Sequence, residues 1–322
     1  MPHDITGLHH VGHIVADIGA AATLYRRLGF HVGPPGFPAW RDMPIGQAGN
    51  HLVPFGAGNT HIEFRRDFIE LVTVLDGPLP AEAFLMPIEV PAERREAVTR
   101  AIHATTRNIR SFLDRFEGLH ITMFDGPDPA ATARRLDAAG IAHGGVHHVA
   151  RPMWTKDGHT TSVPASYLEI GADARVPEGR VGVASNPDTA LLDAQRLPAH
   201  PNGAVGLTEV VLGVPDGELD AQAARYAEIL GRDSESADHG RVFALGGPTL
   251  TIARESRLGK VWPGAEVPRT PGFAVCGVAV DDLAVARELL AANGFSLSET
   301  SGGGVIVPAA EVMGAAMVFT QA

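Results

Sequence analysis

The feature that most constrains this chain is a local pattern that occurs four times. A strand-like segment leads to an aspartate, a short amphipathic helix follows, and a glycine ends the helix. In the first copy the strand-like segment is 8–16, the aspartate is Asp17 and the glycine is Gly29. Aspartate is a favoured helix N-cap and glycine is favoured just beyond a helix end, so each copy predicts one strand followed by one helix.

The other three copies begin near residues 118, 206 and 272. Their expected caps and stops are Asp128 and Gly140, Asp216 and Gly231, and Asp282 and Gly294. Short segments rich in β-branched and apolar residues follow each helix, separated by glycine and proline. The repeated unit is therefore one strand, one helix, and then two or three strands.

Histidines and carboxylates occur at matched places in the first two copies only. The opening strands carry His10 and His120, and the last strands carry Glu70 and Glu169 within apolar runs. Burying an unpaired carboxylate is costly, so each glutamate needs a compensating partner. The third and fourth copies lack both features.

Length and composition restrict the class of protein. A chain of 322 residues, 45% hydrophobic, can bury a sizeable core and suggests about two domains. A net charge of −11 argues against nucleic acid as a partner. The lack of a long apolar run argues against a membrane span, and the N-terminus has no secretory signature. With Cys276 as the single cysteine, we expect a cytoplasmic protein.

The repeats and the matched His and Glu positions resemble the vicinal oxygen chelate superfamily, which includes glyoxalases, antibiotic resistance proteins and extradiol dioxygenases. The resemblance implies an α+β fold of four βαβββ modules, arranged as two paired-module half-barrel domains. The expected metal-binding domain is 1–172, with modules 7–77 and 118–171 joined by a helix at about 91–117. A linker at 173–203 and a degenerate domain without metal ligands at 204–322 complete the expected organisation.

By this resemblance, one divalent metal ion is bound by His10, Glu70, His120 and Glu169. His10 stands seven positions before Asp17, the family's usual interval, whereas His120 stands eight before Asp128 and needs a one-residue insertion. Imidazole and carboxylate suit Zn, Ni, Co, Mn or Fe. Either Glu70 or Glu169 could leave the metal and act as the catalytic base.

The choice of histidine on the first strand leaves an alternative open. His9 and His10 are neighbours on a strand and should face opposite ways, so His9 could replace His10 as the ligand. His13 would share the face of His9, and a site made of His9 and His13 is a local alternative.

A stretch rich in glycine, asparagine and histidine lies between the first helix and the last strand of the first module. Its Asn50, His51, Asn59 and His61 could line the cleft, and turn residues in hairpin loops are the other interpretation. A related glyoxalase-like subfamily carries a similar stretch, which favours a substrate-contacting role for Asn50 and His51.

We therefore expect a metal-dependent glyoxalase-like lyase or isomerase that acts on a small oxygenated substrate through two adjacent oxygens. The alternative enzyme is an Fe(II) or Mn(II) extradiol-type dioxygenase. A third hypothesis is a resistance protein that binds an antibiotic without turnover. A homodimer is compatible with each of these.

Overall fold

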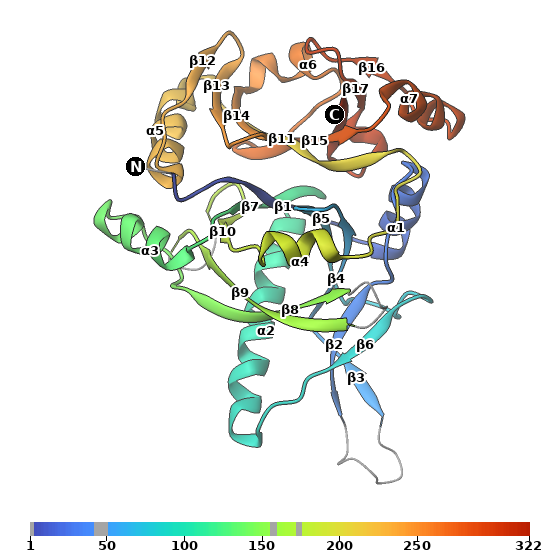
Figure 1. Cartoon of the computed structure of the whole chain (residues 1–322), viewed down its shortest axis with the longest axis vertical. Coiled ribbons are helices and arrows are strands. Elements are labelled where there is room, and N and C mark those ends of the chain that lie inside the picture. The colour runs from blue at the N-terminus through green and yellow to red at the C-terminus, as the bar shows by residue number, and fades with distance from the viewer. Residues whose placement is uncertain (1–2, 42–50, 155–159, 172–175) are drawn as a thin grey trace.

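A computed structural model of the chain describes residues 3–41, 51–154, 160–171 and 176–322. The first half of the chain forms the lower part of Figure 1. Its elements are β1 (Gly7–Ile14), α1 (Ile18–Arg27), β2 (Gly36–Arg41), β3 (Leu52–Pro54), β4 (Ala57–Glu63), β5 (Phe68–Val74), β6 (Phe84–Pro87), α2 (Ala92–Leu113), β7 (Gly118–Asp125), α3 (Pro129–Ala138), β8 (His147–Trp154), β9 (Thr160–Glu169), β10 (Arg180–Ala184) and α4 (Thr189–Ala194).

The second half forms the upper part of Figure 1. Its elements are β11 (Ala204–Val214), η1 (Asp216–Glu218), α5 (Leu219–Leu230), β12 (Glu235–Ala237), β13 (Gly240–Ala244), β14 (Thr249–Arg254), η2 (Glu255–Arg257), α6 (Leu258–Val261), β15 (Gly272–Val280), α7 (Leu283–Ala292), β16 (Ser298–Glu299), β17 (Val305–Val307), η3 (Ala309–Glu311) and β18 (Ala316–Gln321).

Each module is closed by a parallel pairing between its opening strand and its last strand. The four pairs are β1 with β5, β7 with β10, β11 with β14, and β15 with β18. The opening strands then pair antiparallel, β1 with β7 and β11 with β15, which makes two modules into each half. The α+β fold of four modules in two pairs, which the resemblance implied, is confirmed.

The second module closes later in the chain than the sequence suggested. Its closing strand is β10, within the segment expected to be a linker, and not the strand that ends at Glu169. That earlier strand, β9, pairs antiparallel with both β8 and β10. β10 is a five-residue strand between turn-rich segments, so the strand signal in this stretch of sequence is weak.

The predicted helix caps hold in three modules. The side chains of Asp17, Asp128 and Asp282 accept backbone N–H groups of α1, α3 and α7. Asp216 does not cap α5: it lies in the short helix η1, and its carboxylate accepts hydrogen bonds from Ser256 instead. All four stop glycines have positive φ, between 62° and 87°, which is the left-handed conformation that glycine tolerates best.

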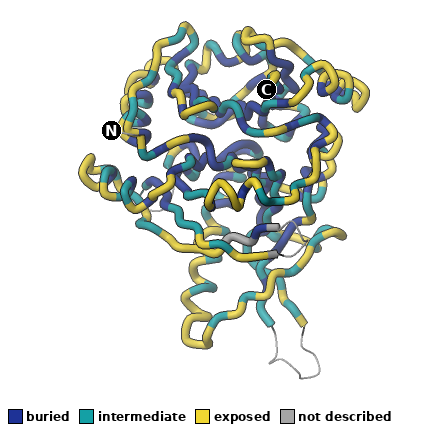
Figure 2. Tube along the Cα trace, in the orientation of Figure 1, coloured by how far each residue is buried: buried dark blue, intermediate teal, exposed yellow. Residues whose placement is uncertain are grey.

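The largest hydrophobic core is continuous across both halves and includes residues of α1, α5 and the four opening strands. Figure 2 shows buried chain concentrated where the two halves meet. On the concave side of the first half, Ile109 and Phe112 of α2 pack against Ile14, Val72 and Ile121. Within the described residues, no helix is both long enough and apolar enough to cross a membrane.

Candidate functional site

A cavity of about 310 Å³ lies in the first half, between β1 and β5 on one side and β9 and β10 on the other. Its lining residues are His9, His10, Glu70, Ile121, Met123, Val149, Ala165, Ser166, Tyr167, Glu169, Arg180, Ala184 and Ser185. A largely apolar wall with a few convergent polar groups is the usual composition of a small-molecule site.

His9 and His10 both reach this cavity, although neighbouring strand residues normally face opposite ways. The pairing of β1 with β7 shifts register between Leu8 and His10, which leaves His9 as an extra residue. The two Nδ1 atoms are 2.8 Å apart, so one ring donates a hydrogen bond to the other. The irregularity thus allows both His9 and His10 to line the cavity.

Glu70 is the carboxylate next to these histidines. Its Oε2 lies 4.0 Å from His10 Nε2, and its side chain is 16% exposed. Burial alone would raise the pKa of Glu70, but contacts with His61, His10 and Asn59 outweigh it and lower the pKa to about 2. Glu70 is therefore ionised at neutral pH.

His61 is a further group at this site, which the sequence indicated only as a residue that could line the cleft. It stands directly opposite Glu70 in the pairing of β4 with β5, and its Nε2 lies 3.7 Å from Glu70 Oε1. Burial opposes its protonation, but Glu63 and Glu70 raise its pKa to about 9. The alternation of β4, with a polar residue every second position, was the signal that could have identified it.

Glu169 lines the opposite side of the cavity and is 7% exposed. Arg180 Nε donates to Glu169 Oε1 at 2.7 Å, and Arg180 Nη2 makes a second contact with the same oxygen. The expected compensating partner of this carboxylate is therefore an arginine in the same cavity.

The structure does not bring His120 to the cavity, whose lining takes Ile121 and Met123 from β7. His120 is fully buried, its Nε2 donates to Phe116 O at 2.9 Å, and its ring packs against Phe116. Burial lowers its pKa to about 4. The residue seven positions before Asp128 is Ile121, so the repeat aligns without an insertion and sets Ile121 in the place of His10.

The other expected positions lie elsewhere. His13 is buried apart from His9, between Tyr25 and the Met313 carbonyl, and burial lowers its pKa to about 4. His51 is exposed just before β3 and does not contribute to the cavity lining found among the described residues. Asn50 lies outside the described residues.

The donor set around Glu70 fits a divalent metal in its chemistry. Imidazole nitrogens and a carboxylate are the groups that bind Zn, Fe or Mn. Over the described ranges, no group of three or more His, Cys, Asp or Glu side chains is arranged so that it could hold a metal ion. Binding would therefore require the imidazoles to move toward Glu70.

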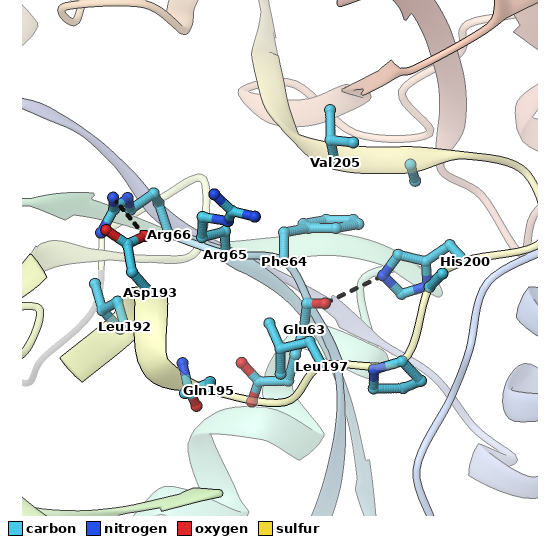
Figure 3. A pocket seen from close by; sticks show the side chains of 13 residues that line it. Glu63, Phe64, Arg65, Arg66, Leu192, Asp193, Gln195, Leu197, His200 and Val205 are labelled. Atoms are coloured by element: carbon cyan, nitrogen blue, oxygen red, sulfur yellow. Dashed lines mark hydrogen bonds and ion pairs between the residues drawn. The ribbon is translucent and has the colours of Figure 1, made fainter. Parts of the chain in front are cut away.

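A second cavity, of about 460 Å³, lies between the β4–β5 turn, the segment 192–200 and the start of β11 (Figure 3). Its main polar groups are engaged with the protein. Arg66 pairs with Asp193 at 2.8 Å, and His200 Nε2 donates to Glu63 O at 3.1 Å while its Nδ1 accepts from His31 N. These contacts hold distant segments of the chain together, so we interpret the polar groups of the second cavity as structural. The first cavity is therefore the better candidate site.

Comparisons with known proteins agree with this fold. A model described as "Glyoxalase-like domain" matches residues 8–230. The sequence matches no curated protein. A hypothetical protein from Staphylococcus aureus shares the fold at 11% identity and TM-score 0.56, covering 98% of this chain and 99% of that one.

Two further solved structures share the fold. A mutant 4-hydroxymandelate synthase from Streptomyces coelicolor has 17% identity and TM-score 0.51, covering 93% of this chain and 78% of that one. The Mn(II)-bound glyoxalase from Novosphingobium aromaticivorans has 13% identity and TM-score 0.51, covering 99% and 83%. At these identities the likeness concerns the fold.

Proposed function

Because this chain belongs to the glyoxalase-like domain family, we propose that it is a divalent-metal-dependent lyase or isomerase acting on a small oxygenated substrate in the first-half cavity. The observation that carries the proposal is the approach of His10 to Glu70 inside a cavity of substrate size. The Mn(II)-bound glyoxalase among the structural neighbours supports the use of a metal.

Several residues of the cavity have distinct roles in this proposal. His10 and Glu70 would hold the ion, which would supply Lewis-acid polarisation of a substrate carbonyl. The buried side chains of Ile121 and Met123 form part of the apolar wall against which the substrate would lie. Glu169 faces the substrate from the other wall, oriented by Arg180, and takes the proton from the carbon next to the carbonyl.

Deuterium incorporation tests this proposal even when the product is unidentified. We would incubate metal-loaded protein in D₂O with a panel of α-hydroxyketones and 2-oxo acids and follow exchange at the α-carbon by NMR. We expect exchange with at least one compound, lost on metal removal and reduced about 10²- to 10⁴-fold by Glu169→Gln, the usual size of a general-base contribution. Exchange that is unaffected by chelation would contradict the proposal.

A second candidate is Fe(II)-dependent oxygenation, because His10, His61 and Glu70 are two histidines and one carboxylate, the ligand count of non-haem iron oxygenases. Oxygen uptake with catechols by the Fe(II)-loaded protein, without deuterium exchange, would favour it. A chain that binds no transition metal even after reloading would favour the antibiotic-binding alternative.

A further inference from the structure

We propose that the metal ion is held entirely within the first module, by His10, His61 and Glu70, and that the second module contributes no ligand. This inference rests on the proposed function, since it assigns the ligands of the ion which that function requires. It differs from an inter-module site, in which each module would give one histidine and one glutamate.

The strand order sets Glu70 between the two histidines. β5 pairs with β1 on one side and with β4 on the other. Directly opposite residues in an antiparallel pair share one face of the sheet, so His61 and Glu70 project together. His10 approaches from β1 and lies 4.0 Å from one carboxylate oxygen, while His61 lies 3.7 Å from the other.

These separations fit a shared ion. Two ligands that each lie about 2.1 Å from one metal can be at most about 4.2 Å apart. Both Nε2-to-oxygen distances are just below this limit, and they run to different oxygens of Glu70. Closing the site therefore requires both imidazoles to rotate toward the same carboxylate group. The Phe68 ring, 4.5 Å from the His10 ring and 4.7 Å from the His61 ring, supports both imidazoles.

The other ring nitrogens already have the partners that metal-binding histidines need. His61 Nδ1 lies 3.3 Å from Glu63 Oε1, and His10 Nδ1 lies 2.8 Å from His9 Nδ1. A ligating histidine usually donates its second N–H to such a group. On binding, the Nδ1–H of His61 would donate to Glu63 and the ion would displace the proton from Nε2. Asn59 Nδ2 donates to Glu70 Oε1 at 2.6 Å and orients the carboxylate in the same way.

The second module lacks the equivalent groups. In the first module, Glu70 pairs with Gly12, which stands five positions before the cap Asp17. In the second module, the residue five positions before the cap Asp128 is Met123, and it pairs with Gly182. A Cβ atom at Gly182 would lie 2.2 Å from Leu168 O, so this position excludes any side chain. Glu169 pairs with Gly182 in the way that His61 pairs with Glu70, so Glu169 occupies the position of His61 in the second module. The Glu169 carboxylate is hydrogen-bonded to Arg180.

Metal affinity of the full chain, with Zn(II) and Co(II) as probes, tests the inference. We would measure Kd by competition titration for the wild type, His61→Ala, Glu63→Gln, Glu70→Gln, Glu169→Gln and His120→Gln. We expect His61→Ala to weaken binding at least 100-fold and Glu63→Gln to weaken it 10- to 100-fold through the second ring nitrogen. Glu169→Gln and His120→Gln should stay within threefold of the wild type.

The Co(II) form gives a second measurement that is independent of affinity. Each bound imidazole contributes one strongly shifted, exchangeable N–H signal in the proton NMR spectrum. We expect two such signals in the wild type and one in His61→Ala.

The outcomes separate this inference from the proposed function. A wild type that cannot be loaded with any metal overturns both. If Glu70→Gln abolishes binding while His61→Ala keeps its affinity and both NMR signals, the single-module site is wrong and the metal-dependent function stands. Loss of binding in Glu169→Gln would restore an inter-module site.

Discussion

The two halves of the molecule have the same architecture and opposite uses of their concave faces. In the first module the residue seven positions before the helix cap is His10, and the closing-strand residue level with Gly12 is Glu70. In the fourth module the same two positions are Val275, before Asp282, and Val318, level with Gly277. Both valines are buried.

The coverings of the two faces differ accordingly. In the second half, Trp262 and Leu258 pack with Val275 and Val318 in one hydrophobic cluster, and Trp262 Nε1 donates to Glu209 Oε1 at 3.3 Å. In Figure 1, α6 lies at the top of the upper half. In the first half, α2 covers only part of the face and leaves open the cavity that contains His10 and Glu70. The same fold thus encloses either a hydrophobic core or a candidate site, depending on which elements cover its concave face.

The largest effect on stability should come from removing a large side chain that packs on the concave face of the second half. Trp262→Ala removes a large buried side chain and should lower the free energy of unfolding by about 3–5 kcal/mol, measured by urea denaturation. Val149→Ala, at the open cavity and 45% exposed, should cost less than about 1 kcal/mol. Similar losses for the two variants would contradict the distinction between a filled and an open face.

A smaller effect is expected where the halves meet. Asp67, before β5, accepts the Leu207 N–H of β11 at 2.9 Å, and burial, together with Asp125 and Glu63, raises its pKa to about 7. The folded state therefore holds this proton to higher pH than the unfolded state does. The resulting stability is full below about pH 4 and is lost as the pH rises through 7.

Asp67→Asn keeps the acceptor oxygen and should remove that pH dependence. A pKa difference of this size corresponds to about 4 kcal/mol for a group shut off from water, and we expect about 2 kcal/mol because Asp67 is partly exposed. The variant should match the wild type at pH 4 and be more stable at pH 8. Parallel stability profiles from pH 4 to pH 8 would show that Asp67 is not the group responsible.

The smallest effect concerns the repeated helix starts. Asp17→Ala and Asp282→Ala, one in each half, should each cost about 1 kcal/mol because each removes two hydrogen bonds from a side-chain cap. Asp216→Ala should leave the helicity of α5 unchanged, since Asp216 bonds to Ser256 and not to that helix. Equal losses of helix in all three, measured by circular dichroism, would contradict this difference.

The sequence predicted the repeated modules because each carries its own local signals: an aspartate cap, an amphipathic helix and a stop glycine. The exception, Asp216, arises because a Ser256 hydroxyl from another part of the chain competes for the carboxylate. The closing strand β10 was missed because its parallel partner β7 is distant in sequence and the strand itself is short.

The candidate site was only partly readable for a related reason. His10 and Glu70 occupy positions that a strand pattern identifies, and the structure brings them together. His61 joins them through the register of β4 against β5, which the sequence does not specify. His120 resembled a ligand because a one-residue shift was allowed, and such a shift moves a side chain to the opposite face of the strand.

The most direct test of the single-module metal site is a crystal structure of Mn(II)- or Co(II)-loaded protein with anomalous diffraction at the metal edge. The account predicts one peak bonded to His10 Nε2, His61 Nε2 and a Glu70 oxygen at about 2.0–2.3 Å, with Glu169 still paired to Arg180. A peak bonded to Glu169, or one without His61, would contradict it.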